Sequence, residues 1–209
     1  MRSRKLGKLI VKTAICTLAV LIGLALILFG VVSLAAPAAM LSVADDLGME
    51  KLAASYSVAV YEKTSGVDDL AEAVERNYAA GEYSVCAEYG SLFLKDPGFS
   101  DYCAARDRAE GSAEGITGSY SQYATGIVAS AQYWTGEKEL SLSTAFGAIG
   151  ETFPQNNAVI SLAAAARSGN DKAFCTVLLS ELKKLTIEDS SEAASLAEFA
   201  AVLSEYCGA

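Results

Sequence analysis

Histidine is absent from all 209 residues, which removes the side chain most often used for acid–base chemistry near neutral pH. Ser-His-Asp catalysis, Cys-His catalysis and His-ligated zinc or haem are therefore excluded. Carboxylate-only and Lys-based mechanisms remain, and two carboxylates suffice for glycoside hydrolysis. One compact cluster contains Asp68, Asp69, Glu72 and Glu75. Their spacing puts them in the first turns of one predicted helix, where the helix dipole and water stabilise them, so we predict no catalytic role.

Four cysteines, Cys86, Cys103, Cys175 and Cys207, form an even set in the C-terminal part of the chain. Pairing of sequence neighbours would join Cys86 to Cys103 and Cys175 to Cys207. With turns at the predicted helix breaks, the members of each pair differ in height by about five residues, or roughly 7 Å. Small buried thiols are the alternative. Because no C-x-x-C pair is present, we predict neither a metal site nor a cofactor.

Aromatic residues offer a further candidate site. The chain has ten tyrosines, many at helical spacing. Tyr78, Tyr83 and Tyr89 are predicted to line a groove, which would suit a peptide or a glycan. The alternative is that these rings fill helix–helix contacts in the core.

The elements that position these residues follow an uncharged run from Thr13 to Val43. A bilayer core about 30 Å thick needs roughly 20 apolar residues in a helix, so residues 13–43 are predicted to form a transmembrane signal anchor. All the basic residues before the run lie within residues 1–12, a predicted cytoplasmic tail: Arg2, Arg4, Lys5, Lys8 and Lys12. The positive-inside rule then places residues 45–209 outside the cytoplasm. The alternative is a secreted form, cleaved between Ala35 and Ala39, where small residues resemble a signal-peptidase site.

The part of the chain after the predicted span is acidic. It holds 11 basic and 25 acidic residues, a net charge of −14. Such a surface repels phosphate backbones, so we predict no nucleic-acid partner and expect partners that are basic or neutral.

Apolar residues at helical spacing, with short breaks at Gly, Asn or Asp, predict an all-α fold of antiparallel helical hairpins. Helices are expected over residues 49–64, 119–134, 139–153, 157–168, 171–185 and 190–206, and from Asp68, Glu82 and Ser100 onward. Ser190 or Ser191 is the expected N-cap of the last helix. Three glycines in residues 111–118 predict a connection between a first sub-bundle, 44–110, and a second, 119–209.

The stretch GEYSVCAEY, from Gly81 to Tyr89, resembles the turn and second helix of a tetratricopeptide repeat, and Asp96-Pro97 resembles the pair that closes such a repeat. In this alignment Cys86 takes a small-residue position, and Phe93 takes another that Ala usually holds. The resemblance implies helix pairs that stack into a solenoid with a groove for peptides or proteins. Helical periodicity alone equally allows a closed bundle.

A second, weaker likeness supports the repeat. The stretch from Gly169 to Ala173 echoes the same turn, and Gly136 lies 33 residues before Gly169, close to the 34-residue period of that repeat.

These features predict a single-pass, membrane-anchored, extracytoplasmic helical-repeat protein of the cell envelope, which acts as a protein-interaction or assembly module. Nothing in the sequence nominates catalytic residues, so no enzyme activity is expected. A histidine-independent envelope enzyme and a secreted small-ligand binder are the alternatives.

Overall fold

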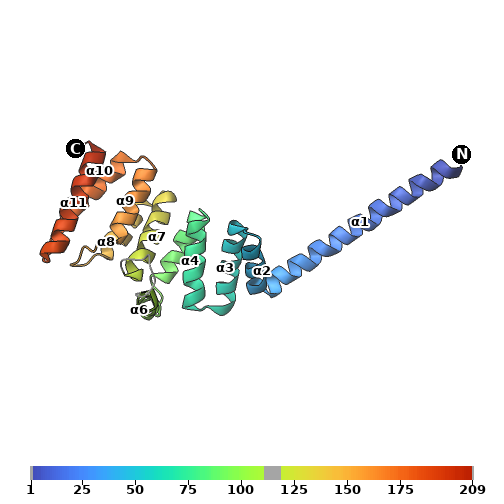
Figure 1. The fold of residues 1–209 in the computed structure, drawn as a ribbon, viewed down its shortest axis with the longest axis horizontal. Helices are drawn as coiled ribbons and strands as arrows, with labels where there is room; N and C mark the ends of the chain where they lie inside the picture. The colour runs from blue at the N-terminus through green and yellow to red at the C-terminus, as the bar shows by residue number, and fades with distance from the viewer. Residues whose placement is uncertain (1, 111–118, 209) are drawn as a thin grey trace.

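The computed structural model describes residues 2–110 and 119–208, and side chains from residues 12 to 109 and 119 to 208. In this part of the chain the regular structure consists of eleven α-helices, without any strand. The predicted all-α fold is confirmed. Figure 1 shows the helices standing side by side in a row, from which the N-terminal helix extends. The predicted connection at 111–118 lies outside the described residues.

The N-terminal helix α1 (Arg2–Ala35) is apolar and stands away from the other helices. The most apolar window within its stretch Lys12–Ala35 has a mean hydropathy of 2.9, and this window is not buried by other residues. It is long and apolar enough to cross a membrane, and a signal sequence has the same character. Pro37 opens the next helix, α2 (Pro37–Asp46), because proline suits the first helical turn and disfavours helix in the residue before it. The uncharged run 13–43 is thus divided between two helices.

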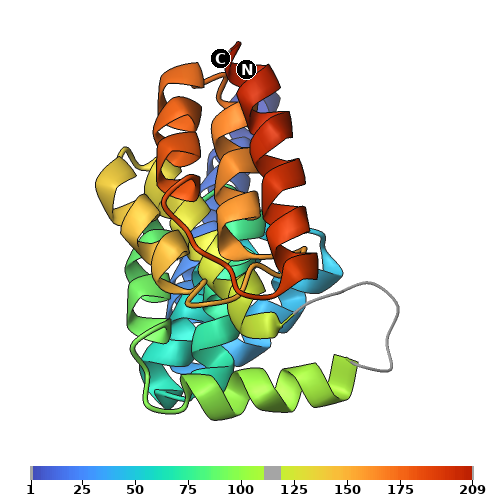
Figure 2. The ribbon, with the colours of Figure 1, turned by 90° about the vertical axis from the view of Figure 1, so that its left-hand side faces the viewer.

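Four pairs of helices repeat one arrangement, and we call their members the first and the second helix. The pairs are α2 with α3 (Glu50–Thr64), α4 (Val67–Ala79) with α5 (Tyr83–Phe93), α7 (Tyr120–Trp134) with α8 (Lys138–Gly147), and α9 (Ala158–Ser168) with α10 (Lys172–Leu182). In Figure 2 the second helices α5, α8 and α10 lie on one side of the row, and α9 lies on the other beside the last helix, α11 (Ser190–Cys207).

The turn inside each pair has the same backbone geometry. One residue adopts a left-handed conformation: Gly48, Gly81, Gly136 and Asn170 have φ of 64°, 74°, 88° and 52°, and we name their turns 1 to 4. The next residue donates its N–H to a carbonyl five residues earlier: Met49 to Ala44, Glu82 to Asn77, Glu137 to Gln132 and Asp171 to Ala166. This bond satisfies a carbonyl at the end of the first helix, and Gly or Asn best tolerates the positive φ.

The four turn residues lie 33, 55 and 34 residues apart. The predicted alignment of Gly169 with Gly136 is wrong by one residue, because Gly169 has φ −75° and Asn170 takes the left-handed position. The long spacing contains helix α6 (Phe99–Glu110) and residues 111–118, inserted between the second and third pairs. Figure 2 shows α6 running almost at right angles to the other helices and projecting from the row.

A small residue is buried five positions after each turn residue. These residues, Ala53, Cys86, Ser141 and Cys175, are at most 2 % exposed. Each lies in the first turns of a second helix, where its size lets that helix approach the first. The described core has three parts: around α2 and α3, around α4 to α7, and around α7 to α11.

The last helix begins differently from the prediction. Asp189 is its N-cap, and its carboxylate accepts from the backbone N–H groups of Ser191 and Glu192 at 2.8 and 2.9 Å. The expected Ser190 or Ser191 cap is therefore wrong, since a carboxylate one residue earlier already satisfies the free N–H groups.

Candidate interaction face

We call the surface formed by α2, α4, α7, α9 and α11 the first-helix face, and three of the cavities in the described part of the chain lie beside its helices. The cavity between α2 and α4 has a volume of about 220 Å³, and the cavity between α9 and α11 about 370 Å³. The largest, of about 630 Å³, lies where α6 meets α4, and we call it the α4–α6 corner. Two of these cavities thus lie between helices of this face, and the third lies where the inserted helix α6 meets α4.

The α4–α6 corner is lined by charged groups and one phenol. Helix α4 contributes Asp68, Glu72, Glu75 and Arg76, and α6 contributes Tyr102 and Arg106. Asp68, Glu72 and Glu75 belong to the four-residue acidic cluster that is predicted to be stabilised by the helix dipole and to have no catalytic role. The unequal spacing of the turns is the signal that could have pointed to α6 and hence to this corner.

Arg76 is held by acids from two helices. Its Nη1 and Nη2 atoms lie 2.6 and 3.0 Å from the two carboxylate oxygens of Asp45 on α2, and its Nε lies 2.7 Å from Glu72. The hydrogen bond to Asp45 is the main reason why the pKa of Arg76 is raised. Planar, two-pronged pairing of this kind fixes geometry as well as charge. Arg76 thus ties the first pair of helices to the second.

Tyr120 joins α7 to the corner. Its hydroxyl donates to the Glu75 carboxylate, and its ring lies 5.5 Å from that of Tyr102. The Arg106 guanidinium lies 5.1 Å from the Tyr120 ring centre, within cation–π range. Burial, followed by the hydrogen bond to Glu75, raises the pKa of Tyr120, so the phenol stays protonated and donates. These contacts fix α6 against the first helices α4 and α7.

The predicted tyrosine groove is divided between two places. Tyr78 and Tyr83 lie together, with ring centres 5.7 Å apart, and Tyr83 stacks on Trp134 at 5.8 Å. Tyr133 continues this row of rings, at 5.1 Å from Trp134 and 5.0 Å from Phe174. The aromatic row therefore runs along turns 2, 3 and 4.

Tyr89 lies elsewhere, on the second helix α5. Its ring packs edge-on against Tyr61 at 5.8 Å, and its hydroxyl donates to Glu62 at 2.9 Å. Burial and this carboxylate raise the pKa of Tyr89 to about 12. The role of the three tyrosines in binding stays a prediction.

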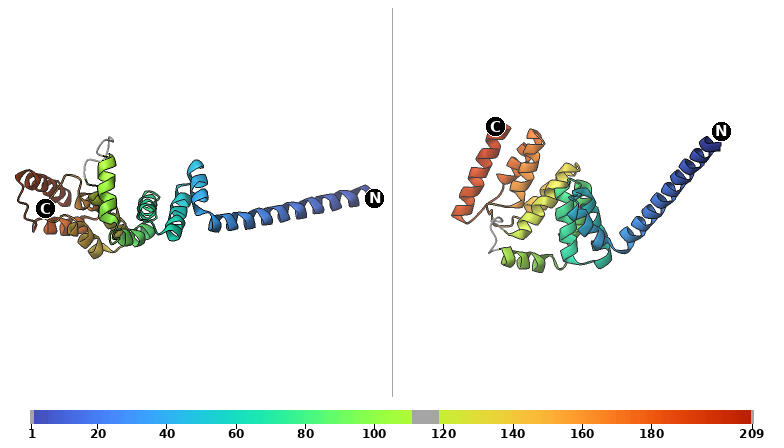
Figure 3. Two further views of the ribbon diagram at one scale, coloured as in Figure 1. Left: turned by 90° about the horizontal axis from the view of Figure 1, so that it is seen from below. Right: turned by 45° about the vertical axis from the view of Figure 1, so that its right-hand side comes forward.

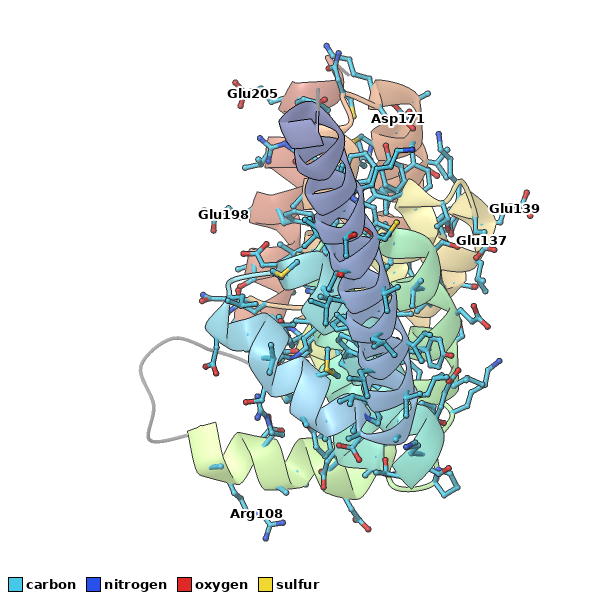
Figure 4. The ribbon with its side chains drawn as sticks, turned by 90° about the vertical axis from the view of Figure 1, so that its right-hand side faces the viewer. Arg108, Glu137, Glu139, Asp171, Glu198 and Glu205 are labelled. Carbon is cyan, nitrogen blue, oxygen red and sulfur yellow. The ribbon has the colours of Figure 1, made fainter. Side chains whose placement is uncertain are left out.

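Acidic side chains lie along both edges of the row of helices. Figure 4 shows Glu198 and Glu205 pointing outward on the α11 side, and Glu137 and Glu139 on the opposite side. Asp171 in turn 4 is instead paired with Lys138, the second residue after the turn residue of turn 3. Both edges are therefore accessible to a charged partner, while this ion pair links neighbouring turns.

All five cysteines are thiols in the structure. Cys86, Cys103 and Cys175 are buried, and burial raises their pKa values to about 12, 11 and 11. A thiol with a raised pKa carries little thiolate near neutral pH and is a poor nucleophile or metal ligand. The disulfide pairing of Cys86 with Cys103, and of Cys175 with Cys207, stays a prediction. Within the described residues no group of three or more His, Cys, Asp or Glu side chains is arranged to hold a metal ion.

Comparison with known proteins gives no relative: no family model, no curated protein and no solved structure matches the chain.

Proposed function

We propose that this chain is a single-pass membrane protein whose tetratricopeptide-like domain lies outside the cytoplasm and binds a protein partner through the first-helix face. The observation that carries the proposal is the repetition of one turn, at Gly48, Gly81, Gly136 and Asn170, each followed by a small buried residue. Two of the three spacings, 33 and 34 residues, match the period of that repeat. Each such unit buries its apolar side by stacking on the next.

The anchor is supported by α1. A helix with no charge after Lys12 and no packing partner along its apolar window suits a hydrocarbon environment better than water. The basic residues before Lys12 favour a cytoplasmic N-terminus under the positive-inside rule. The helical row, joined to the other end of α1, would then lie outside.

The partner's chemistry follows from charge. The chain after the proposed anchor has a net charge of −14, and the α4–α6 corner contains three carboxylates and two arginines, of which Arg76 is already paired with Asp45 and Glu72. Opposite charge speeds association and favours the right partner, so a segment rich in Lys or Arg is the best complement. The cavities at the α4–α6 corner and between α9 and α11 would receive its side chains.

The test is quantitative crosslinking in native membranes with a C-terminal tag. The double variant Asp68→Lys/Glu198→Lys changes two acids of the first-helix face, and Glu88→Lys/Glu139→Lys changes two exposed acids of the second helices α5 and α8. We expect recovery of a defined partner to fall only with the first variant. If both variants recovered the same amount of partner, the proposed binding face would be contradicted.

Topology needs a separate measurement. Protease added to intact cells should remove the C-terminal tag, because residues 45–209 are proposed to lie outside. Digestion that occurs only after lysis would contradict the proposed location and leave the binding face open to test.

A further inference from the structure

Turn 1 has the geometry of the other three turns but a different chemistry. The residue before the left-handed position is Leu47, where turns 2 to 4 have Ala80, Thr135 and Gly169. The residue after it is Met49, where the others have Glu82, Glu137 and Asp171. Because the backbone is the same, the fold does not require apolar side chains at these positions. Among the four turns, only turn 1 has large apolar side chains on both sides of the left-handed residue, although polar side chains would fit the same backbone.

These side chains are only partly used for packing, and Met49 also lines the cavity between α2 and α4. Leu47 is 67 % exposed, and Met49 and Val43, one helical turn before Leu47, are each 47 % exposed. Single exposed apolar residues are common, but adjacent ones that form a patch indicate a contact surface. This patch needs a partner that is itself apolar.

The patch lies beside the anchor helix. Figure 1 shows α1 leaning toward the edge of the row that carries the turns, and α2 and turn 1 as the part of that edge nearest to α1. The two views in Figure 3 agree that α2 turns away sharply at the end of α1, instead of continuing its line. Because α2 has only 10 residues, turn 1 lies within about 15 Å of the end of the apolar helix.

Two hydrogen bonds hold the domain to that end of α1. Lys63 Nζ donates to the Ala35 carbonyl at 2.8 Å, and the hydroxyls of Ser33 and Tyr56 lie 2.8 Å apart. A lysine and a tyrosine at the end of an apolar helix are also residues that favour the membrane–water interface. The position of turn 1 relative to the end of α1 is thus fixed by specific contacts.

We propose that Val43, Leu47 and Met49 enter the interfacial layer of the bilayer beside α1 and hold the helical row in one orientation on the membrane. This inference rests on the proposed membrane anchor. The apolar patch is separated from α1 only by the first part of the short helix α2, and the headgroup region is the surface that an anchored domain meets first and that accepts apolar side chains. The exposed acids Asp46 and Glu50 flank the patch, so the lipid that fits is zwitterionic and not anionic.

Tryptophan fluorescence of the full chain in phosphatidylcholine vesicles tests this contact. In separate samples the lipids carry bromine near the headgroup end or near the middle of the acyl chains, and each quenches tryptophan at its own depth. The background is Trp134→Phe, since Trp134 is the only tryptophan. Leu47→Trp and Met49→Trp report on turn 1, Ala80→Trp and Glu82→Trp are the matched positions of turn 2, and Leu26→Trp reports on the anchor.

We expect quenching by the shallow bromine and a blue shift at positions 47 and 49, quenching by the deep bromine at position 26, and neither effect at positions 80 and 82. Quenching at position 26 without quenching at 47 and 49 would overturn the inference and leave the anchor intact. Equal quenching at turns 1 and 2 would overturn it as well, because the chemistry of turn 1 would then be irrelevant. No quenching at position 26 would overturn the anchor, and this inference with it.

Discussion

Gly90 shows how one missing side chain sets the distance between two helices. It lies on α5, and an added Cβ would be 2.5 Å from Val128 Cγ2 on α7. Valine has little rotamer freedom in a helix, so it has no other position to take. Gly90→Ala should overpack this contact and lower the free energy of unfolding by about 1–3 kcal/mol, measured by denaturant unfolding of the detergent-solubilised full chain.

Gly147 provides the matched control. It is the last residue of α8, and an added Cβ would meet nothing within 4 Å. Gly147→Ala should be neutral or stabilise the protein by up to about 1 kcal/mol, because alanine favours helix more than glycine does. A similar loss of stability in both variants would show that the α5–α7 contact is not the cause.

Asp171 gives a prediction for the dependence of stability on pH. The Lys138 ammonium, and then the Phe174 backbone N–H, hold the pKa of Asp171 below its usual range. A lowered pKa in the folded state contributes stability above the unfolded value of about 3.9, and this contribution is lost as pH falls through the folded pKa. Asp171→Asn keeps an oxygen that can cap α10 but removes the charge.

We therefore expect Asp171→Asn to lower stability at pH 7 by about 1 kcal/mol, since Lys138 is partly exposed. The difference from the unsubstituted protein should shrink as pH falls below about 4. Unfolding free energies measured at a series of pH values give the comparison. A difference that stays constant down to the lowest pH would mean that charge on Asp171 does not matter.

At the scale of elements, helical periodicity predicted the helices after Met49, because each apolar face is a local property of the sequence, but it placed the end of one too late: the helix predicted at 139–153 is observed at Lys138–Gly147. The predicted helix at 49–64 is observed at Glu50–Thr64, and that at 119–134 at Tyr120–Trp134. Periodicity could not show that Asn170, and not Gly169, matches Gly136, because both residue types can end a helix. Nor could it place α6 against α4, since this arrangement brings together residues far apart in the chain, such as Glu75 and Tyr102, which line the same corner.

The aromatic row predicts that Trp134 stabilises neighbouring turns although it is 39 % exposed. Trp134 contacts Tyr83 and Tyr133, and an added Cβ at Gly169 would lie 3.3 Å from its ring. Each such aromatic pair contributes about 0.5–1.5 kcal/mol beyond burial, so Trp134→Ala should cost about 1–3 kcal/mol. Thermal unfolding would measure the loss.

Leu140 on α8 is a fitting control for that variant, because it is 45 % exposed and has no ring contact. Leu140→Ala should change stability little, as most surface substitutions do. Equal losses for Trp134→Ala and Leu140→Ala would indicate that exposure alone, and not the row of rings, determines the effect.

At the scale of the whole molecule, the repeated pairs raise the question of how unfolding spreads. In a solenoid each unit contacts only its neighbours, so a local defect loosens nearby units first. In a closed bundle a defect in any helix weakens all of them. The described core already divides into one part around α4 to α7 and another around α7 to α11. The two parts meet at α7, the first helix of the third pair, and α6 packs within the first of them.

Two fully buried leucines distinguish the solenoid from the bundle. Leu70 on α4 is 1 % exposed and Leu178 on α10 is 0 % exposed, so either Leu→Ala change should cost about 2–5 kcal/mol. Hydrogen exchange measured by mass spectrometry should show faster exchange in α8 to α11 for Leu178→Ala, and in α3 to α5 for Leu70→Ala. Each variant controls the other, because the side chain, its burial and its substitution are matched. Faster exchange throughout the domain in both variants would establish a single cooperative bundle, whereas separate responses would mean that the stacked pairs support one another only locally.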